Sequence, residues 1–150
     1  MKTRSLVLLA ALCAPVLALA GEYTHQQLRL EKAADEENRL EAAKMFAFGS
    51  VGFGGRVSEE EHQFKAILAL EPAEAKQKLE KLYSSGNPQA MSYALAGMRK
   101  LDRKRYAELL VSARASGLIV TTMRGCIMSH EKLRTVADDL DSGIYDVWLR

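Results

Sequence analysis

The sequence predicts a mainly α-helical protein of stacked antiparallel helical hairpins, with a possible short β-hairpin near residues 118–128. Three observations support this fold class. Apolar residues recur at helical spacing in four consecutive segments between residues 58 and 117. A helix start or stop signal stands at each junction between these segments. After Gly117 the pattern changes to a β-branched run, which favours an extended strand.

The first two predicted helices occupy residues 58–70 and 72–83. Ser58 to Glu61 has the form of a capping box, a hydroxyl residue followed three positions later by glutamate. Pro72 suits the first turn of a new helix, because no N–H donor is needed there. The apolar stripes of the two helices are Phe64, Ile67 and Leu68, and then Ala75, Leu79, Leu82 and Tyr83.

The third and fourth predicted helices begin at Asn87-Pro88 and at Asp102, both with good N-cap residues, and the fourth ends at Ser116-Gly117. Short connections favour antiparallel neighbours. Shifting the first pair of helices by about 30 residues along the sequence superimposes its apolar residues on those of the second pair. A period of this length is typical of stacked helical repeats. An irregular helical bundle with a chance period is the alternative. The stripes here are Met91, Ala94, Leu95, Met98 and Leu101, and then Tyr106, Leu109, Leu110 and Ala113.

The segments on either side of these helices are expected to cover their ends. Residues 24–47 are rich in good helix formers and predict a long helix whose second half packs on the core. Residues 118–122 and 126–128 are the two expected strands, with Gly125 at the turn. Ser129 is expected to cap a last helix that ends at residues 141–143. Residues 144–149 are too apolar to extend freely into solvent, so we expect them to pack back on the domain, with a partner-binding tail as the alternative.

The first 20 residues have the features of a secretory signal peptide, with Lys2 and Arg4 before an apolar run and a small-x-small site ending at Ala20. We expect cleavage after Ala20, a single α-helical domain over residues 21–150, and a periplasmic or secreted location. The apolar run is shorter than a membrane span, so no span is expected after cleavage. An uncleaved anchor is the alternative.

Cleavage would change both the charge and the cysteine content. The whole chain has 21 Lys and Arg against 19 Asp and Glu. Loss of Lys2 and Arg4 makes the remaining chain formally neutral, which argues against general nucleic-acid binding because such proteins need a surplus of cations. Cys13 is also lost, so Cys126 remains as a single thiol that is buried, paired with another chain or reactive.

Residues 48–55 contain four glycines and two phenylalanines. A phosphate-binding loop of the Walker type would end in Lys-Ser or Lys-Thr, whereas Arg56-Val57 follows here. We therefore interpret the glycines as positions where the backbone passes close to neighbouring helices. Phe48, Val51 and Phe53 are expected to fill the core.

Two groups of residues are candidates for a site. Cys126, Met128 and His130 alternate, and an extended strand would place them on one side, where soft sulfur and imidazole suit Cu(I). The competing interpretation places Cys126 and Met128 in the core and His130 at a helix start. The second group is a cation cluster at the turn between the third and fourth helices. It is either a solvated face or a surface for an acidic protein, lipid head groups or a polyanion, and it consists of Arg99, Lys100, Arg103, Lys104 and Arg105.

Several short patterns resemble a family of small exported bacterial proteins of uncharacterised function, some of which occur in microcin gene clusters. They are Phe46-Ala47-Phe48-Gly49, Gly52, Gly54-Gly55, Ser58-Glu59, Phe64, Tyr93-Ala94-Leu95-Ala96-Gly97 and Gly125-Cys126-Ile127. The resemblance covers roughly residues 44–143. It implies no active site, but it implies that the Gly-rich loop and the Gly-Cys turn belong to the framework of the domain.

The expected function is that of a non-enzymatic exported protein that binds a protein or peptide partner, with no catalytic residue and no cofactor assigned. A narrower form of this hypothesis is an immunity or inhibitor protein. The alternative is a soft-metal or thiol-dependent protein centred on Cys126 and His130.

Overall fold

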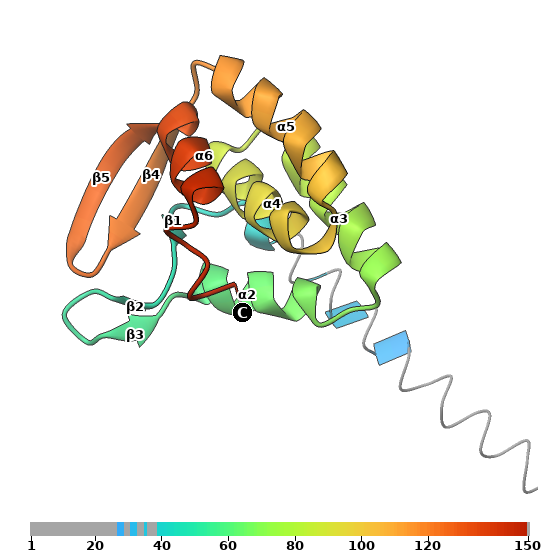
Figure 1. The fold of residues 1–150 in the computed structure, drawn as a ribbon. Helices are drawn as coiled ribbons and strands as arrows, with labels where there is room; N and C mark the ends of the chain where they lie inside the picture. The colour runs from blue at the N-terminus through green and yellow to red at the C-terminus, as the bar shows by residue number, and fades with distance from the viewer. Residues whose placement is uncertain (1–26, 29–30, 33–34, 36–38, 150) are drawn as a thin grey trace, which may run out of the picture. The chain divides into compact units, whose positions relative to one another are not determined.

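The computed structural model describes residues 27–28, 31–32, 35 and 39–149. The chain divides into two compact units, residues 1–34 and 35–150. Residues 27–28 and 31–32 of the first unit are helical. The predicted signal peptide, its cleavage site after Ala20 and Cys13 lie outside the described residues. The helices and strands labelled in Figure 1 belong to the second unit.

The second unit is mainly helical and carries two small sheets, which confirms the predicted fold class (Figure 1). The helices are α2 (Glu59–Leu68), α3 (Pro72–Ser84), α4 (Pro88–Leu101), α5 (Arg103–Ala115) and α6 (Leu133–Ser142). The strands are β1 (Phe46–Ala47), β2 (Ser50–Val51), β3 (Arg56–Val57), β4 (Ile119–Arg124) and β5 (Ile127–Lys132). No helix in this part of the chain is long and apolar enough to cross a membrane.

The predicted helix starts are confirmed at the level of single hydrogen bonds. The Ser58 hydroxyl accepts from the N–H of Glu61 at 3.1 Å, and the Asp102 carboxylate accepts from the N–H of Arg105 at 3.1 Å. The side chain of Asn87 accepts from the first turn of α4 in the same way. Each bond satisfies an N–H group that has no partner inside its own helix.

Helix α4 is the centre of the bundle. It contacts α2, α3, α5 and α6 and also strands β1 and β4, and all residues from Ala90 to Met98 are buried. Gly97 lets α3 approach closely, because a Cβ atom at this position would lie 2.6 Å from Cδ1 of Leu79. In a stack of helical repeats, each repeat contacts only its neighbours. Because α4 is instead surrounded by the other elements, the arrangement corresponds to the irregular helical bundle, the alternative given above.

The three-stranded sheet has the order β1-β4-β5. Strands β4 and β5 form the predicted hairpin, but β5 continues to Lys132, paired with Ile119, and α6 begins only at Leu133. The expectation that Ser129 caps the last helix is therefore wrong, because pairing with β4 keeps this polar segment extended. The prediction that the first helix continues to residue 47 is also wrong. The helix stops at Glu41, and Phe46–Ala47 instead pair in parallel with β4.

The Gly-rich segment forms the β2–β3 hairpin, whose tip is attached to the β4–β5 turn by a hydrogen bond from the N–H of Gly52 to the carbonyl oxygen of Gly125 at 2.9 Å. Phe48 is buried, as expected. The prediction that Phe53 fills the core is wrong, because this side chain is 103% exposed at the hairpin tip. Val51 is half-buried.

The aromatic part of the core joins segments that are distant in sequence. Five rings pack mainly edge to face with centroids 4.9–5.7 Å apart. They belong to Phe46, Phe48, Phe64, Tyr93 and Tyr145. The burial of Tyr145 and Leu149 confirms that the segment after α6 packs back on the domain.

Candidate functional site

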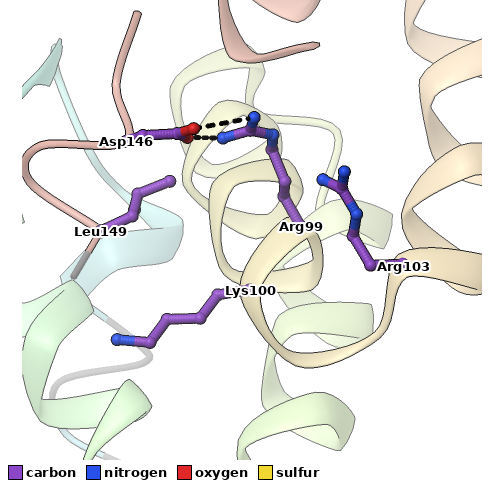
Figure 2. Close-up of a pocket in the computed structure, with 5 residues that line it drawn as sticks. All are labelled: Arg99, Lys100, Arg103, Asp146 and Leu149. Carbon is purple, nitrogen blue, oxygen red and sulfur yellow. Dashed lines mark hydrogen bonds and ion pairs between the residues drawn. The ribbon is translucent and has the colours of Figure 1, made fainter. Parts of the chain in front are cut away.

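A pocket of about 490 Å³ lies where the end of α4 and the start of α5 meet the segment that follows α6. Figure 2 shows the residues that line it. Three are cations, one is a carboxylate and one is apolar: Arg99, Lys100, Arg103, Asp146 and Leu149. The predicted cation cluster therefore contributes three of its five members to one cavity.

The turn between α4 and α5 places the cations. Arg99 and Lys100 belong to the last turn of α4, and Arg103 is the first residue of α5. Asp102 stands between them and holds the turn. Its carboxylate caps α5 and forms an ion pair with Nζ of Lys76 at 3.0 Å. The hydrogen bond from the backbone of Arg105 and the one from Lys76 lower the pKa of Asp102.

Arg99 is fixed by a carboxylate from the C-terminal segment. Both terminal nitrogens of its guanidinium group contact the carboxylate of Asp146, as the dashed lines in Figure 2 show. The Arg99 side chain is only 11% exposed. Gly143 permits the turn that brings Asp146 here, since its φ is +87° and a Cβ atom would lie 2.9 Å from Oδ2 of Asp146.

Lys100 and Arg103 are the available cations of the pocket. Both are exposed, and no ion pair or hydrogen bond joins either of them to another residue that the structure describes. Asp146 balances the charge of Arg99, so the lining carries two formal positive charges in excess. Such a surplus attracts an anionic group.

The other two residues of the predicted cluster lie elsewhere. Arg105 forms a bidentate contact with Glu80 of α3, with Nε and Nη2 at 2.5 and 2.9 Å from the carboxylate oxygens, and it also pairs with Glu108 at 2.8 Å. These hydrogen bonds raise the pKa of Arg105. Lys104 is exposed but does not line the pocket. Arg105 therefore connects α5 to α3, and Lys104 is a natural control residue.

Two buried polar atoms near this turn have no partner among the described residues: Nε of Arg99 and the hydroxyl group of Tyr106. Burial is the main cause of the raised pKa of Tyr106, and Asp141 adds to it, whereas Arg99 and Arg103 act in the opposite direction. Tyr106 thus lies in the electrostatic field of two pocket cations. Its neutral hydroxyl group makes no contribution to holding them in place.

The soft-metal candidates do not line the pocket and lie in the β4–β5 hairpin. Met128 and His130 alternate on β5, as predicted, and His130 Nδ1 lies 3.1 Å from the Thr121 hydroxyl. Cys126 lies in the turn and not in β5, so it does not continue the alternation of Met128 and His130 along the strand. Within the described ranges, no three His, Cys, Asp or Glu side chains group as metal ligands do.

The competing interpretation of these residues as core is wrong. Cys126 and His130 are exposed, and Met128 is 56% exposed. Strand alternation explains the result for Met128 and His130. The buried β4 residues Val120 and Thr122 pair with Glu131 and Ser129, so Met128 and His130 lie on the other face of the hairpin.

Asp146 and Leu149 are the pocket residues that sequence reasoning missed. The apolar character of residues 144–149 indicated that the segment packs back, but it carried no signal that Asp146 would meet Arg99, 47 positions earlier. Chemically, the assembled pocket offers cations and one apolar residue, an arrangement suited to holding an anionic group.

Comparison with models of protein families found no match, and comparisons with curated proteins and with solved structures found no significant similarity.

Proposed function

We propose that this chain is a non-enzymatic exported protein that binds a protein or peptide partner, and that the pocket at the α4–α5 turn receives an acidic group of that partner. The observation that carries the proposal is the state of Lys100 and Arg103. Both line the pocket, both are exposed, and neither is paired with another described residue.

The rest of the molecule supports a rigid binding surface. Arg99 is held by Asp146, and the turn itself is fixed by Asp102 and its contacts with Lys76 and Arg105. The contacts of Arg99 and Asp102 fix the turn from which the unpaired side chains of Lys100 and Arg103 extend, so the backbone of the site loses little conformational entropy when it binds. This arrangement suits recognition by shape and charge.

The experiment is capture of partners from a bacterial periplasmic extract on immobilised residues 21–150. Three proteins are compared: the unchanged chain, Arg103→Glu and Lys104→Glu. The two variants carry the same change of charge in adjacent positions, but only Arg103 lines the pocket. A specific partner should be retained by the unchanged chain and by Lys104→Glu, and lost by Arg103→Glu.

Equal retention by all three proteins would contradict a role for the pocket, and repeated failure to capture any protein would contradict the proposal as a whole. The narrower hypothesis, an immunity or inhibitor protein, has a separate test. A toxin gene adjacent to the gene of this protein, and neutralisation of that toxin by the purified chain, are the expected findings.

A second candidate function, a soft-metal or thiol-dependent role centred on Cys126 and His130, is favoured by one observation. The thiol of Cys126 is exposed, which is the condition that such a role requires. The His130 side chain and the sulfur of Met128 lie on the same exposed hairpin. Copper uptake distinguishes this candidate from the first.

A further inference from the structure

We infer that the tips of the two β-hairpins form a second contact surface of this protein, and that this surface docks on a phospholipid bilayer that contains anionic lipids. The hairpin-tip surface consists of Phe53, Arg56, Cys126, Ile127 and Met128. The inference goes beyond the proposed function, because none of these residues lines the pocket. It follows from the position of the two tips, from the apolar side chains that they expose and from their charge.

The two tips are held side by side by a hydrogen bond. The N–H of Gly52 in the β2–β3 turn donates to the carbonyl oxygen of Gly125 in the β4–β5 turn at 2.9 Å. In Figure 1 both turns extend away from the helices. A second bond, from the N–H of Gly55 to the carbonyl oxygen of Gly52 at 3.1 Å, closes the β2–β3 turn. These backbone groups have partners within the protein, so the tips can leave water without losing the hydrogen bonds.

Three large apolar side chains of the hairpin-tip surface lie in solvent. Phe53 is 103% exposed, Ile127 is 70% exposed and Met128 is 56% exposed. Phe48 of the same Gly-rich segment is buried in the aromatic core, so the segment is anchored without any contribution from Phe53. Exposed apolar side chains that gather in one place mark contacts with proteins or membranes.

The directions of these side chains favour the bilayer as the occupant. Successive residues of a strand point to opposite faces, so Ile127 and Met128 extend from opposite faces of the β4–β5 hairpin, and Phe53 extends from the neighbouring tip. A flat protein surface would cover one face and leave the other in water. Lipid surrounds any tip that enters the boundary between head groups and acyl chains, where aromatic and aliphatic side chains are favourable.

The charge of the hairpin-tip surface fits anionic head groups. Residues 50–57 and 124–128 include two arginines and no Asp or Glu. Arg124 is paired with Asp139. Arg56 is exposed, and no ion pair or hydrogen bond joins its side chain to another residue in the described part of the chain. Its guanidinium group is therefore available to a lipid phosphate, which arginine binds through paired hydrogen bonds.

The test measures sedimentation of the protein with lipid vesicles. It uses residues 21–150, because the apolar run before Ala20 would itself bind lipid. The vesicles consist of phosphatidylcholine alone or of phosphatidylcholine with one third phosphatidylglycerol. The protein should bind the vesicles with phosphatidylglycerol at least fivefold more tightly. Absence of binding to these vesicles would overturn the inference and leave a pocket in a partner protein as the occupant. Equal binding to both kinds would contradict the assignment to anionic lipid.

Matched variants of exposed residues localise the contact. Phe53→Ser and Ile127→Ser should each weaken binding at least fivefold. Val111→Ser should leave it within twofold, although Val111 on α5 is 69% exposed. Arg56→Gln should weaken binding to the phosphatidylglycerol vesicles about fivefold, the contribution of one cation near an anionic membrane surface. Equal losses for Phe53→Ser and Val111→Ser would show that the contact is not at the hairpin tips.

The cation cluster at the α4–α5 turn is the other surface that would attract anionic vesicles. Arg103→Glu should leave vesicle binding within threefold. Loss of binding in Arg103→Glu, with Phe53→Ser unaffected, would assign the lipid contact to that cluster and overturn the inference. Vesicle binding is measured without the partner sought in the capture experiment, so the proposed function and this inference fail separately.

Cys126 provides a direct measure of insertion. It is exposed in the β4–β5 turn and is the single cysteine of residues 21–150. The emission of an environment-sensitive fluorophore attached to it should shift to shorter wavelength when phosphatidylglycerol vesicles are added. Vesicle binding without this shift would overturn the inference. In sedimentation velocity, the protein without lipid should be a monomer. A dimer that Phe53→Ser dissociates would instead assign the hairpin-tip surface to a second copy of this chain.

Discussion

The hydroxyl group of Tyr93 forms hydrogen bonds with both backbone polar groups of Ala47. It accepts from the N–H at 3.0 Å and donates to the carbonyl oxygen at 2.9 Å. The side chain thus takes the place of a missing strand at the outer edge of β1. Burial raises the pKa of Tyr93, so the phenol keeps the proton that it donates.

The first prediction compares two buried tyrosines. Tyr93→Phe should lower the free energy of unfolding by about 2–3 kcal/mol, because it leaves two buried backbone groups without partners. Tyr106→Phe should change it by less than about 0.5 kcal/mol, because the hydroxyl group of Tyr106 has no partner among the described residues. Urea unfolding followed by circular dichroism measures both. A larger loss for Tyr106→Phe would contradict the assignment.

The second prediction concerns the close approach of α4 and α3. Gly97→Ala should destabilise the protein despite the higher helix propensity of alanine, because the new Cβ atom would lie 2.6 and 2.8 Å from the methyl carbons of buried Leu79. In a Leu79→Ala background the same substitution should stabilise, since the space is then open. A double-mutant cycle in urea measures the change of sign, and additive effects would argue against this contact.

The third prediction concerns acid stability. The pKa of Asp102 is lowered from its ordinary value of 3.8, so its carboxylate stabilises the fold above that pH. That stabilisation is lost as the pH falls through the lowered pKa. Asp102→Asn keeps a capping oxygen but loses the charge and the ion pair with Lys76. The variant should be less stable than the unchanged chain at pH 6, and the difference should shrink below pH 3.8. Thermal unfolding across this range checks the trend, and a constant difference would contradict it.

The fourth prediction separates the two phenylalanines of the Gly-rich segment. Phe48→Ala should cost about 3–5 kcal/mol of unfolding free energy, because the ring is buried among four other aromatic rings. Phe53→Ser should change it by less than about 0.5 kcal/mol, since this ring is fully exposed. Denaturant midpoints compare the two variants. A loss above 1.5 kcal/mol for Phe53→Ser would mean that its ring is packed in solution.

The fifth prediction tests the hairpin that carries Cys126. Its exposed thiol should react rapidly with a thiol reagent in the folded protein, at a rate close to that in urea. The proposed binding function predicts that Cu(I) is not taken up stoichiometrically in competition with a chromogenic chelator. One equivalent of bound Cu(I), abolished by His130→Ala, would instead favour the soft-metal function.

Local signals allowed most of the fold to be predicted. Ser58, Asn87 and Asp102 cap the helices that follow them, as their spacing indicated, and these effects operate within one helical turn. The errors arise where distant segments decide the structure. Phe46 pairs with Thr122, 76 positions away, and pairing of β5 with β4 extends a segment that resembles a helix start. Such pairing leaves little trace in either segment alone.

The candidate site could be predicted only in part for the same reason. The cluster of cations around Asp102 is visible in the sequence, but the sequence does not show which cations line the pocket and which form ion pairs elsewhere. Arg105 turns to Glu80 of α3, whereas Arg99 meets Asp146 from the C-terminal segment. These ion pairs depend on how α3, α5 and that segment pack, and no pattern of neighbouring residues encodes them.

Trp148 gives this fold an internal optical reporter. It is the single tryptophan of the sequence, its indole covers Gly49, and its ring centroid lies 6.1 Å from that of Tyr145. The segment that carries it also carries Asp146 and Leu149, two of the pocket residues. Intrinsic fluorescence should therefore change when a ligand alters the surroundings of this segment, so occupancy can be followed without attaching a dye.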